Sequence, residues 1–98
     1  MKKKQKYLSL DEFGSAIGLN RFDKEMIRQK NRAIDYLKAT RLKKGISQAE
    51  LAGRFGTKQP AIARMEAGFV GEISFDFLVR VALALGVPFE VIPTRKAA

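Results

Sequence analysis

Residues 47–68 read SQAELAGRFGTKQPAIARMEAG, and this stretch decides the fold. Ser47 can cap a helix by accepting a hydrogen bond from the amide of Glu50. The Glu50 side chain can reach back to the Ser47 amide and complete a capping box. The helix is expected over Gln48–Phe55, and it ends at Gly56, because glycine readily adopts the left-handed conformation that closes a helix.

A second short helix is expected directly after this turn. Thr57 is expected to cap it, and Gly68 ends it. Pro60 falls in its first turn, where a missing amide hydrogen is tolerated because those donors have no partner within the helix. Two capped helices joined by a tight turn are typical of proteins that place one helix in the major groove of DNA.

Composition limits the alternatives. The chain has 98 residues, of which 46% are hydrophobic, so we expect one domain with a modest core. Cysteine and histidine are absent. Disulfides, the usual zinc sites and Ser-His or Cys-His nucleophiles are therefore excluded, and we expect no catalytic residue, no metal and no cofactor. No apolar run approaches the ~20 residues of a membrane span and no secretory signal is evident, so we expect a cytoplasmic protein.

The net charge of +9 points to a polyanionic partner. Residues 41–68 carry six basic and two acidic side chains, and residues 1–30 carry eight and four. Residues 69–98 carry three of each. The positive charge therefore lies on the two short helices and on the N-terminal arm, whereas the last third of the chain is neutral and apolar.

Further capping signals precede the two short helices. Ser9 and Glu12 form a second S-x-x-E box, which predicts a short helix that ends at Gly18. Asn20 is expected to cap a longer helix that runs toward Lys44, with apolar residues at helical spacing.

After the two short helices, Ser74 is expected to cap a helix over Phe75–Leu85. Residues 89–92 alternate apolar and polar side chains like a short strand. We therefore predict an all-α fold of five helices with an N-terminal helical extension and a short C-terminal β-strand. Its expected parts are a basic arm with a short helix at 1–30 and a DNA-binding domain with a strand-like tail at 31–98.

Residues 41–85 resemble the Xre-type helix-turn-helix family, which includes the lambdoid phage repressors, the Cro proteins and many antitoxins. The residues that carry the resemblance are Gln48, Leu51, Ala52, Gly56, Ile62, Glu66 and Gly68, followed by Leu78 and the stretch 82–86. The resemblance covers about half of the chain and implies a lambda-repressor-like fold.

The resemblance also implies roles for particular residues. In this family the glutamine that begins the first helix clamps a phosphate, which gives that role to Gln48. The family buries an arginine–glutamate pair between the preceding helix and the end of the recognition helix, which would be Arg41 with Glu66. One departure is Pro60, where many members have serine or glutamine. Bases are read from the start of the second helix, which carries over to Lys58, Gln59, Pro60 and Arg64.

The chemistry of these side chains suits DNA independently of the family. Arg64 can bond guanine O6 and N7, Gln59 can pair with adenine N6 and N7, and Pro60 can contact a thymine methyl group. The first residues of the helix that starts after Ser47 add free amides for a phosphate. Exposed charges on a helix often form nothing more than a solvated surface, and that is the alternative. Three lysines are better suited to phosphate contacts, namely Lys43, Lys44 and Lys58.

The helix expected over Phe75–Leu85 is apolar nearly all round, with only two charged residues. One side should pack on the two short helices, which leaves Phe75, Val79 and Leu83 as a surplus apolar patch. We expect a twofold homodimer that buries this patch and spaces two recognition helices along a palindromic operator in double-stranded DNA. In the alternative, the N-terminal helices cover the patch within one subunit.

The leading interpretation is a sequence-specific repressor. The N-terminal arm, the loop at 68–74 and the strand-like tail most resemble HigA-type antitoxins, which implies a small RNase-type toxin as partner and repression of the shared operon. The alternative is a stand-alone phage-type or metabolic repressor without a toxin. A nuclease is disfavoured because the acidic residues are scattered instead of clustered for a metal.

Overall fold

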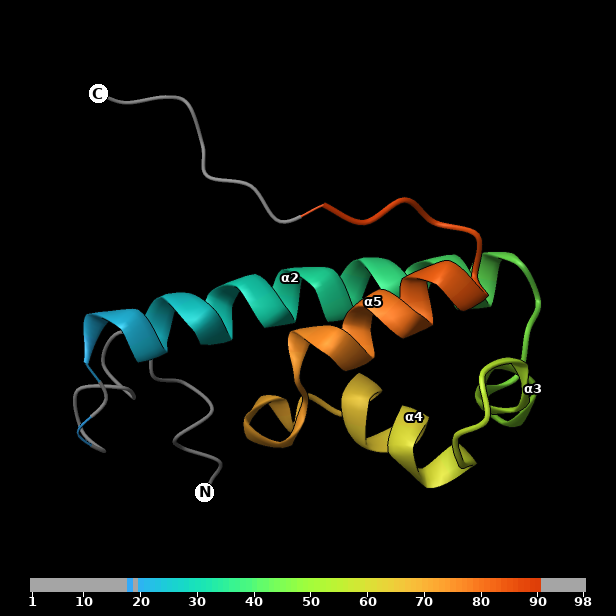
Figure 1. Cartoon of the computed structure of the whole chain (residues 1–98), viewed down its shortest axis with the longest axis horizontal. Helices are drawn as coiled ribbons and strands as arrows, with labels where there is room; N and C mark the ends of the chain where they lie inside the picture. The colour runs from blue at the N-terminus through green and yellow to red at the C-terminus, as the bar shows by residue number, and fades with distance from the viewer. Residues whose placement is uncertain (1–17, 19, 91–98) are drawn as a thin grey trace, which may run out of the picture.

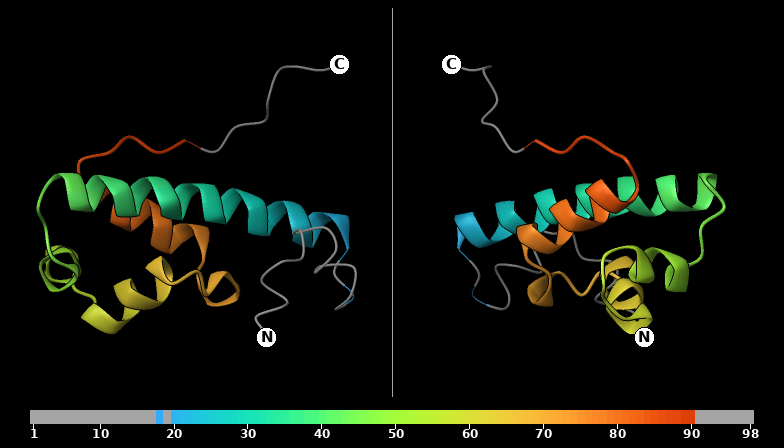
Figure 2. Two further views of the ribbon diagram at one scale, coloured as in Figure 1. Left: turned by 180° about the vertical axis from the view of Figure 1, so that it is seen from behind. Right: turned by 45° about the vertical axis from the view of Figure 1, so that its right-hand side comes forward.

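The computed structural model describes residue 18 and residues 20–90, and all regular structure in this part of the chain is helical. The order is α2 (Arg21–Lys43), α3 (Gln48–Arg54), α4 (Gln59–Glu66), the short 3-10 helix η2 (Val70–Glu72) and α5 (Phe75–Ala84). Helix α2 lies along one edge of the molecule with α5 packed against it, and α4 lies along the opposite edge (Figure 1). The view from behind shows the same arrangement, with α3 below the C-terminal end of α2 (Figure 2).

The long helix begins where the sequence predicts. The Asn20 side chain accepts from the Asp23 amide at 2.8 Å, and the Asp23 carboxylate accepts from the Asn20 amide at 3.4 Å. This reciprocal pair is a capping box. Helix α2 ends at Lys43 and the chain turns at Gly45, whose φ of +69° is in the left-handed region. The expected long helix is therefore confirmed to within one residue at its end.

Serine caps define α3 and α5. The Ser47 hydroxyl accepts from the Glu50 amide at 2.9 Å, and the Ser74 hydroxyl accepts from the Phe77 amide at 3.1 Å. Both caps are confirmed. The Glu50 carboxylate lies 3.7 Å from the Arg54 guanidinium, so it forms an i,i+4 ion pair instead of completing the expected box.

The predicted cap of α4 is wrong by one residue. The amide of Thr57 donates to the carbonyl of Ala52 at 3.0 Å, so Thr57 belongs to the closure of α3. Lys58 is the N-cap, in an extended conformation and with no side-chain cap. An ammonium group cannot accept a hydrogen bond, so the side chain of Lys58 leaves the first amides of α4 uncapped. Pro60 is in the first turn, as expected.

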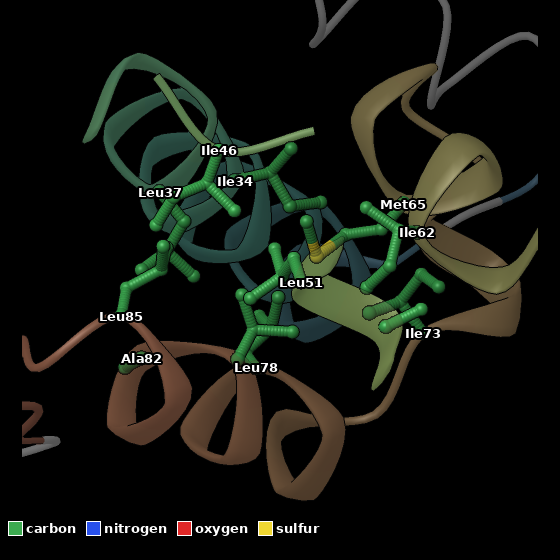
Figure 3. Close-up of a cluster of buried hydrophobic side chains, with 12 residues drawn as sticks. Ile34, Leu37, Ile46, Leu51, Ile62, Met65, Ile73, Leu78, Ala82 and Leu85 are labelled. Carbon is green, nitrogen blue, oxygen red and sulfur yellow. The ribbon is translucent and has the colours of Figure 1, made fainter. Parts of the chain in front are cut away.

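The core of the described residues is a cluster that joins α2, α3, α4 and α5 (Figure 3). Leu51 of α3 is at its centre, with Ile62 and Met65 of α4 on one side and Leu78 of α5 on another. These four side chains are fully buried. The other members are Ile34, Leu37, Ile46, Ala52, Ile73, Val81, Ala82 and Leu85. This packing holds the short helices in place, because helices of seven or eight residues are not stable alone.

Two expected elements fall at or beyond the limits of the described residues. The helix expected between Ser9 and Gly18 lies outside them, except for Gly18 itself. The expected strand at 89–92 is described only at its first two residues, and these are not in a strand. Phe89 instead packs against the core from an irregular segment. Helix α2 runs without a break through residues 30 and 31, where the sequence suggested a boundary.

Candidate nucleic-acid interface

The two sides of α4 differ in exposure. Ile62 and Met65 are fully buried, whereas Gln59, Pro60 and Arg64 are exposed. Helix α4 begins at Gln59, and its N-terminal end is the part of the helix farthest from α2 in two opposite views (Figures 1 and 2). The exposed side of α4 thus carries the Gln59 amide at the outward N-terminal end and the Arg64 guanidinium in the last turn, two groups that are able to bond base edges.

A buried ion pair anchors the other end of α4. The Arg41 Nε donates to Glu66 Oε2 at 2.6 Å, and Arg41 Nη2 donates to Glu66 Oε1 at 2.8 Å. Arg41 Nη1 donates to the carbonyl of Ile46 at 2.7 Å. The side chains of Arg41 and Glu66 are only 9% and 3% exposed. The pair that the resemblance implied is therefore present in bidentate form, and it ties α2, α4 and the loop before α3 together.

The environment of this pair keeps both groups charged. Burial raises the pKa of the Glu66 carboxyl, but hydrogen bonds from Arg41 and Gln48 outweigh burial, and the net pKa lies below its ordinary value. The hydrogen bond to Glu66 raises the pKa of Arg41 against the opposing effect of burial. Ionised Glu66 is therefore the stable form near neutral pH.

Two glutamines extend this pair to the surface. Gln48 Nε2 donates to Glu66 Oε1 at 3.0 Å, and Gln48 Oε1 accepts from Gln59 Nε2 at 2.7 Å. These are the first residues of α3 and α4. The sequence analysis assigned both glutamines to DNA but missed their contact with each other. Their matching positions at the starts of two adjacent helices are the signal that could have revealed it.

The expected phosphate-binding residues lie at the ends of helices. Lys43 and Lys44 are exposed at the end of α2, just before the loop to α3. Ser47 caps α3, and Lys58 is exposed at the start of α4. The structure therefore places these groups at the ends of three helices, and of them only Lys58 adjoins the start of α4.

Arg64 has an acidic neighbour that the sequence analysis missed. Its Nε lies 3.9 Å from Glu72 Oε1, and the two side chains are 61% and 63% exposed. Glu72 belongs to η2, in a segment that the sequence analysis treated as a plain loop. The pair is long and solvated, so Arg64 remains accessible from solvent.

The expected dimer patch is only partly exposed. Leu83 is 68% exposed, whereas Phe75 and Val79 are partly buried. Lys30 of α2 lies over the Phe75 ring, with Nζ 5.8 Å from the centroid, and donates to the carbonyl of Val70 at 3.4 Å. Helix α2 thus shields Phe75 within one subunit and leaves Leu83 uncovered.

Two features are absent from the described part of the chain. Within residue 18 and residues 20–90, no helix is long and apolar enough to cross a membrane. The same residues contain no group of three or more acidic side chains placed to hold a metal ion.

A profile of the helix-turn-helix family matches residues 37–92, which include α3 and α4. An uncharacterized HTH-type transcriptional regulator of Haemophilus influenzae is 34% identical over 77 residues, covering 76% of this chain and 78% of that protein. No solved structure shows significant similarity to the chain. The chain belongs to the helix-turn-helix family, and α3 and α4 form its helix pair.

Proposed function

We propose that this protein is a sequence-specific DNA-binding transcriptional repressor. One observation carries the proposal, namely that α4 is anchored by its buried side and presents Gln59, Pro60 and Arg64 on its exposed side. The name of the Haemophilus influenzae relative supports the same role. With DNA as its proposed partner, the protein would act in the cytoplasm.

Recognition would divide between bases and phosphates. Arg64 bonds guanine, Gln59 bonds adenine, and Pro60 contacts a thymine methyl group. Gln48 and the amides at the start of α3, capped by Ser47, contact one phosphate. Lysines contribute sequence-independent affinity that falls with salt, and the candidates are Lys43, Lys44 and Lys58.

The test begins with selection of bound fragments from genomic DNA by the full chain. Arg64→Ala is then expected to weaken binding to the selected site by about 1–3 kcal/mol and to relax one base preference. Lys43→Ala is the matched control, because it should weaken binding to all sequences equally and reduce the salt dependence. Unchanged base preference in Arg64→Ala would refute the proposed register. Magnesium-dependent nicking by the pure protein would favour a nuclease instead.

We further propose a homodimer that reads a palindromic operator. The exposed Leu83 on α5 supports it, and the partly buried Phe75 and Val79 would contribute what area they leave exposed. A twofold axis would place two copies of α4 about 34 Å apart, one turn of DNA. Sedimentation at micromolar concentration should show a dimer that Leu83→Glu dissociates. A species of 11 kDa alone would refute the dimer.

The finer proposal is that the protein is the antitoxin of a type II toxin–antitoxin pair and represses its own operon. The first half of α2 supports it, because residues 21–33 contribute no fully buried side chain and Phe22 is 79% exposed. Such a surface exceeds what a DNA-reading domain requires and is available to a protein partner. The alternative is a stand-alone phage-type or metabolic repressor.

Gene context and co-expression distinguish these two roles. A small RNase-type reading frame next to this gene, whose toxicity is suppressed by co-expression of this chain, would establish the antitoxin. Phe22→Asp should abolish suppression while leaving operator binding intact, whereas Arg64→Ala should do the reverse. Absence of any neighbouring toxic gene would favour the stand-alone repressor.

A further inference from the structure

We propose that Glu72 is a specificity-determining residue, which opposes the binding of Arg64 to phosphates and leaves its binding to guanine largely unopposed. The inference rests on the proposed function, because it takes Arg64 as a reader of guanine. It gives the acidic neighbour of Arg64 a part in distinguishing the selected site from other DNA, without requiring that Glu72 contact a base.

The first step is that the backbone, and not the ion pair, places Glu72 beside Arg64. The amide of Phe69 donates to the carbonyl of Arg64 at 3.2 Å, and the amide of Glu72 donates to the carbonyl of Phe69 at 3.0 Å. The next residue, Ile73, is buried in the core with 7% exposed. The backbone of both residues is therefore held in place, and the carboxylate stays within reach of the guanidinium even when the solvated pair is open.

The second step is the kind of cation that Glu72 pairs with. Arg64 is a proposed base reader, and its side chain is 61% exposed. Three other ion pairs in the described part of the chain each join an acid to an arginine that has no proposed contact with a base, namely Glu25–Arg28, Glu66–Arg41 and Glu50–Arg54. Glu72 therefore acts on a cation of the proposed reading surface, and those three acids do not.

The third step is the effect of the carboxylate on phosphates. Arg64 Nε and Glu72 Oε1 are 3.9 Å apart. At distances well beyond this separation the two opposite charges largely cancel, so Arg64 adds little to the sequence-independent attraction to DNA. A phosphate that approaches Arg64 must either displace Glu72 or lie beside a like charge. Glu72 therefore lowers the affinity for any duplex on which Arg64 finds only phosphates.

The fourth step is the effect of the carboxylate on guanine. Glu72 approaches Arg64 at Nε, and the two Nη groups hold four of the five N–H donors of the guanidinium. Guanine O6 and N7 are neutral acceptors, so they can take two of these donors without bringing a negative charge to Glu72. The other three bases present at most one acceptor on this edge. The penalty from Glu72 therefore falls mainly on phosphate contacts, and the guanine site gains relative to other DNA.

The DNA test compares the affinity of the full chain for the selected site with its affinity for random duplexes. Glu72→Gln keeps the shape of the side chain and removes its charge. We expect both affinities to rise, but the affinity for random duplexes to rise about threefold more, as for one added phosphate contact. The salt dependence of binding to random duplexes should also become steeper by about one unit of log affinity per unit of log salt.

Glu50→Gln is the matched control for net charge. Glu50 lies 3.7 Å from Arg54, and the two side chains are 56% and 42% exposed, so this substitution removes the same charge beside a different arginine. It should leave the ratio of the two affinities unchanged. In an Arg64→Ala background, Glu72→Gln should also leave the ratio unchanged, because the cation on which Glu72 acts is absent. A fall in the ratio of equal size in Glu50→Gln would overturn the inference.

The outcomes separate the inference from the proposed function. If Arg64→Ala leaves the base preference unchanged, the proposed register fails and the inference fails with it. If Arg64→Ala relaxes one base preference but Glu72→Gln raises both affinities by the same factor, the proposed function stands and the inference is overturned. Because the Glu72 side chain is 63% exposed, we expect Glu72→Gln to fold like the unmodified chain, which circular dichroism checks.

Discussion

The buried and exposed sides of α4 show how eight residues divide two tasks. Ile62, Met65 and Glu66 face the core and the ion pair, whereas Gln59 and Arg64 face solvent. Substitutions on the buried side should change stability, and those on the exposed side should change binding. The difference teaches that a buried anchor and an accessible polar surface can occupy one short helix.

The two arginine–glutamate pairs at this helix also differ in burial. Arg41 and Glu66 form a buried bidentate pair, whereas Arg64 and Glu72 are 3.9 Å apart and mostly exposed. The first pair has lost its hydration and depends on its partner, so breaking it is costly. The second keeps its water and can exchange partners at little cost.

The largest expected effect is that of Arg41→Met. It leaves the Glu66 carboxylate buried without its counter-ion, and we expect a loss of about 3–5 kcal/mol in the free energy of unfolding. Urea denaturation followed by circular dichroism measures it. The double variant Arg41→Met with Glu66→Leu should recover much of the loss, because no buried charge then remains. A loss below 1 kcal/mol in the single variant would show that the pair is hydrated in solution.

The next effect contrasts the two sides of α4 directly. Ile62→Ala removes a fully buried side chain and should cost about 2–5 kcal/mol of stability. Arg64→Ala, on the exposed side of the same helix, should change stability by no more than about 0.5 kcal/mol. Thermal unfolding of both variants under one set of conditions tests the contrast. Comparable losses in the two variants would break it.

Acid should reduce the contribution of Glu66, on the buried side of α4, to the stability of the folded protein. The pKa of Glu66 in the folded protein lies below its ordinary value of 4.5, so the folded state binds this proton less readily than the unfolded state. Its contribution to stability is therefore fully present above pH 4.5 and is lost as the pH falls through the folded pKa. Unfolding curves from pH 7 to pH 3 should show a smaller decline for Glu66→Gln than for the unmodified chain. Parallel declines would contradict this assignment.

The smallest effect belongs to the exposed pair. Glu72→Gln should change stability by less than about 1 kcal/mol, because solvated pairs contribute little. It also removes a negative charge beside Arg64, so affinity for DNA should rise slightly for all sequences. Urea denaturation measures the change in stability. Titrations with selected and random duplexes measure the change in affinity. A change in stability as large as that of Arg41→Met would erase the contrast between the two pairs.

Local hydrogen bonds explain most of what could be predicted. The caps at Asn20, Ser47 and Ser74 each join a side chain to an amide three residues later, so neighbouring residues specify them. Thr57 has the right chemistry for a cap but failed as a prediction. Its amide instead closes α3 on the carbonyl of Ala52, and capping preference alone does not show which helix a turn residue serves.

The candidate site also has features that local spacing predicts and contacts that it does not predict. The exposed residues of α4 could be assigned from periodicity, because its core-facing side chains recur at helical spacing. The contact of Gln48 with Gln59 joins residues that are 11 positions apart, and the pairing of Arg41 with Glu66 spans 25. The first was missed, and the second was expected only through the resemblance.

The amino-acid sequence alone determined the helical class, the caps at Asn20, Ser47 and Ser74 and the basic character of the helix pair. These properties depend on composition and on contacts between residues three or four apart. Only the tertiary structure decided the contact of Gln48 with Glu66 and Gln59 and the partial cover of Phe75 by Lys30. Each of these depends on how separate helices pack, and packing brings together side chains that no local spacing relates.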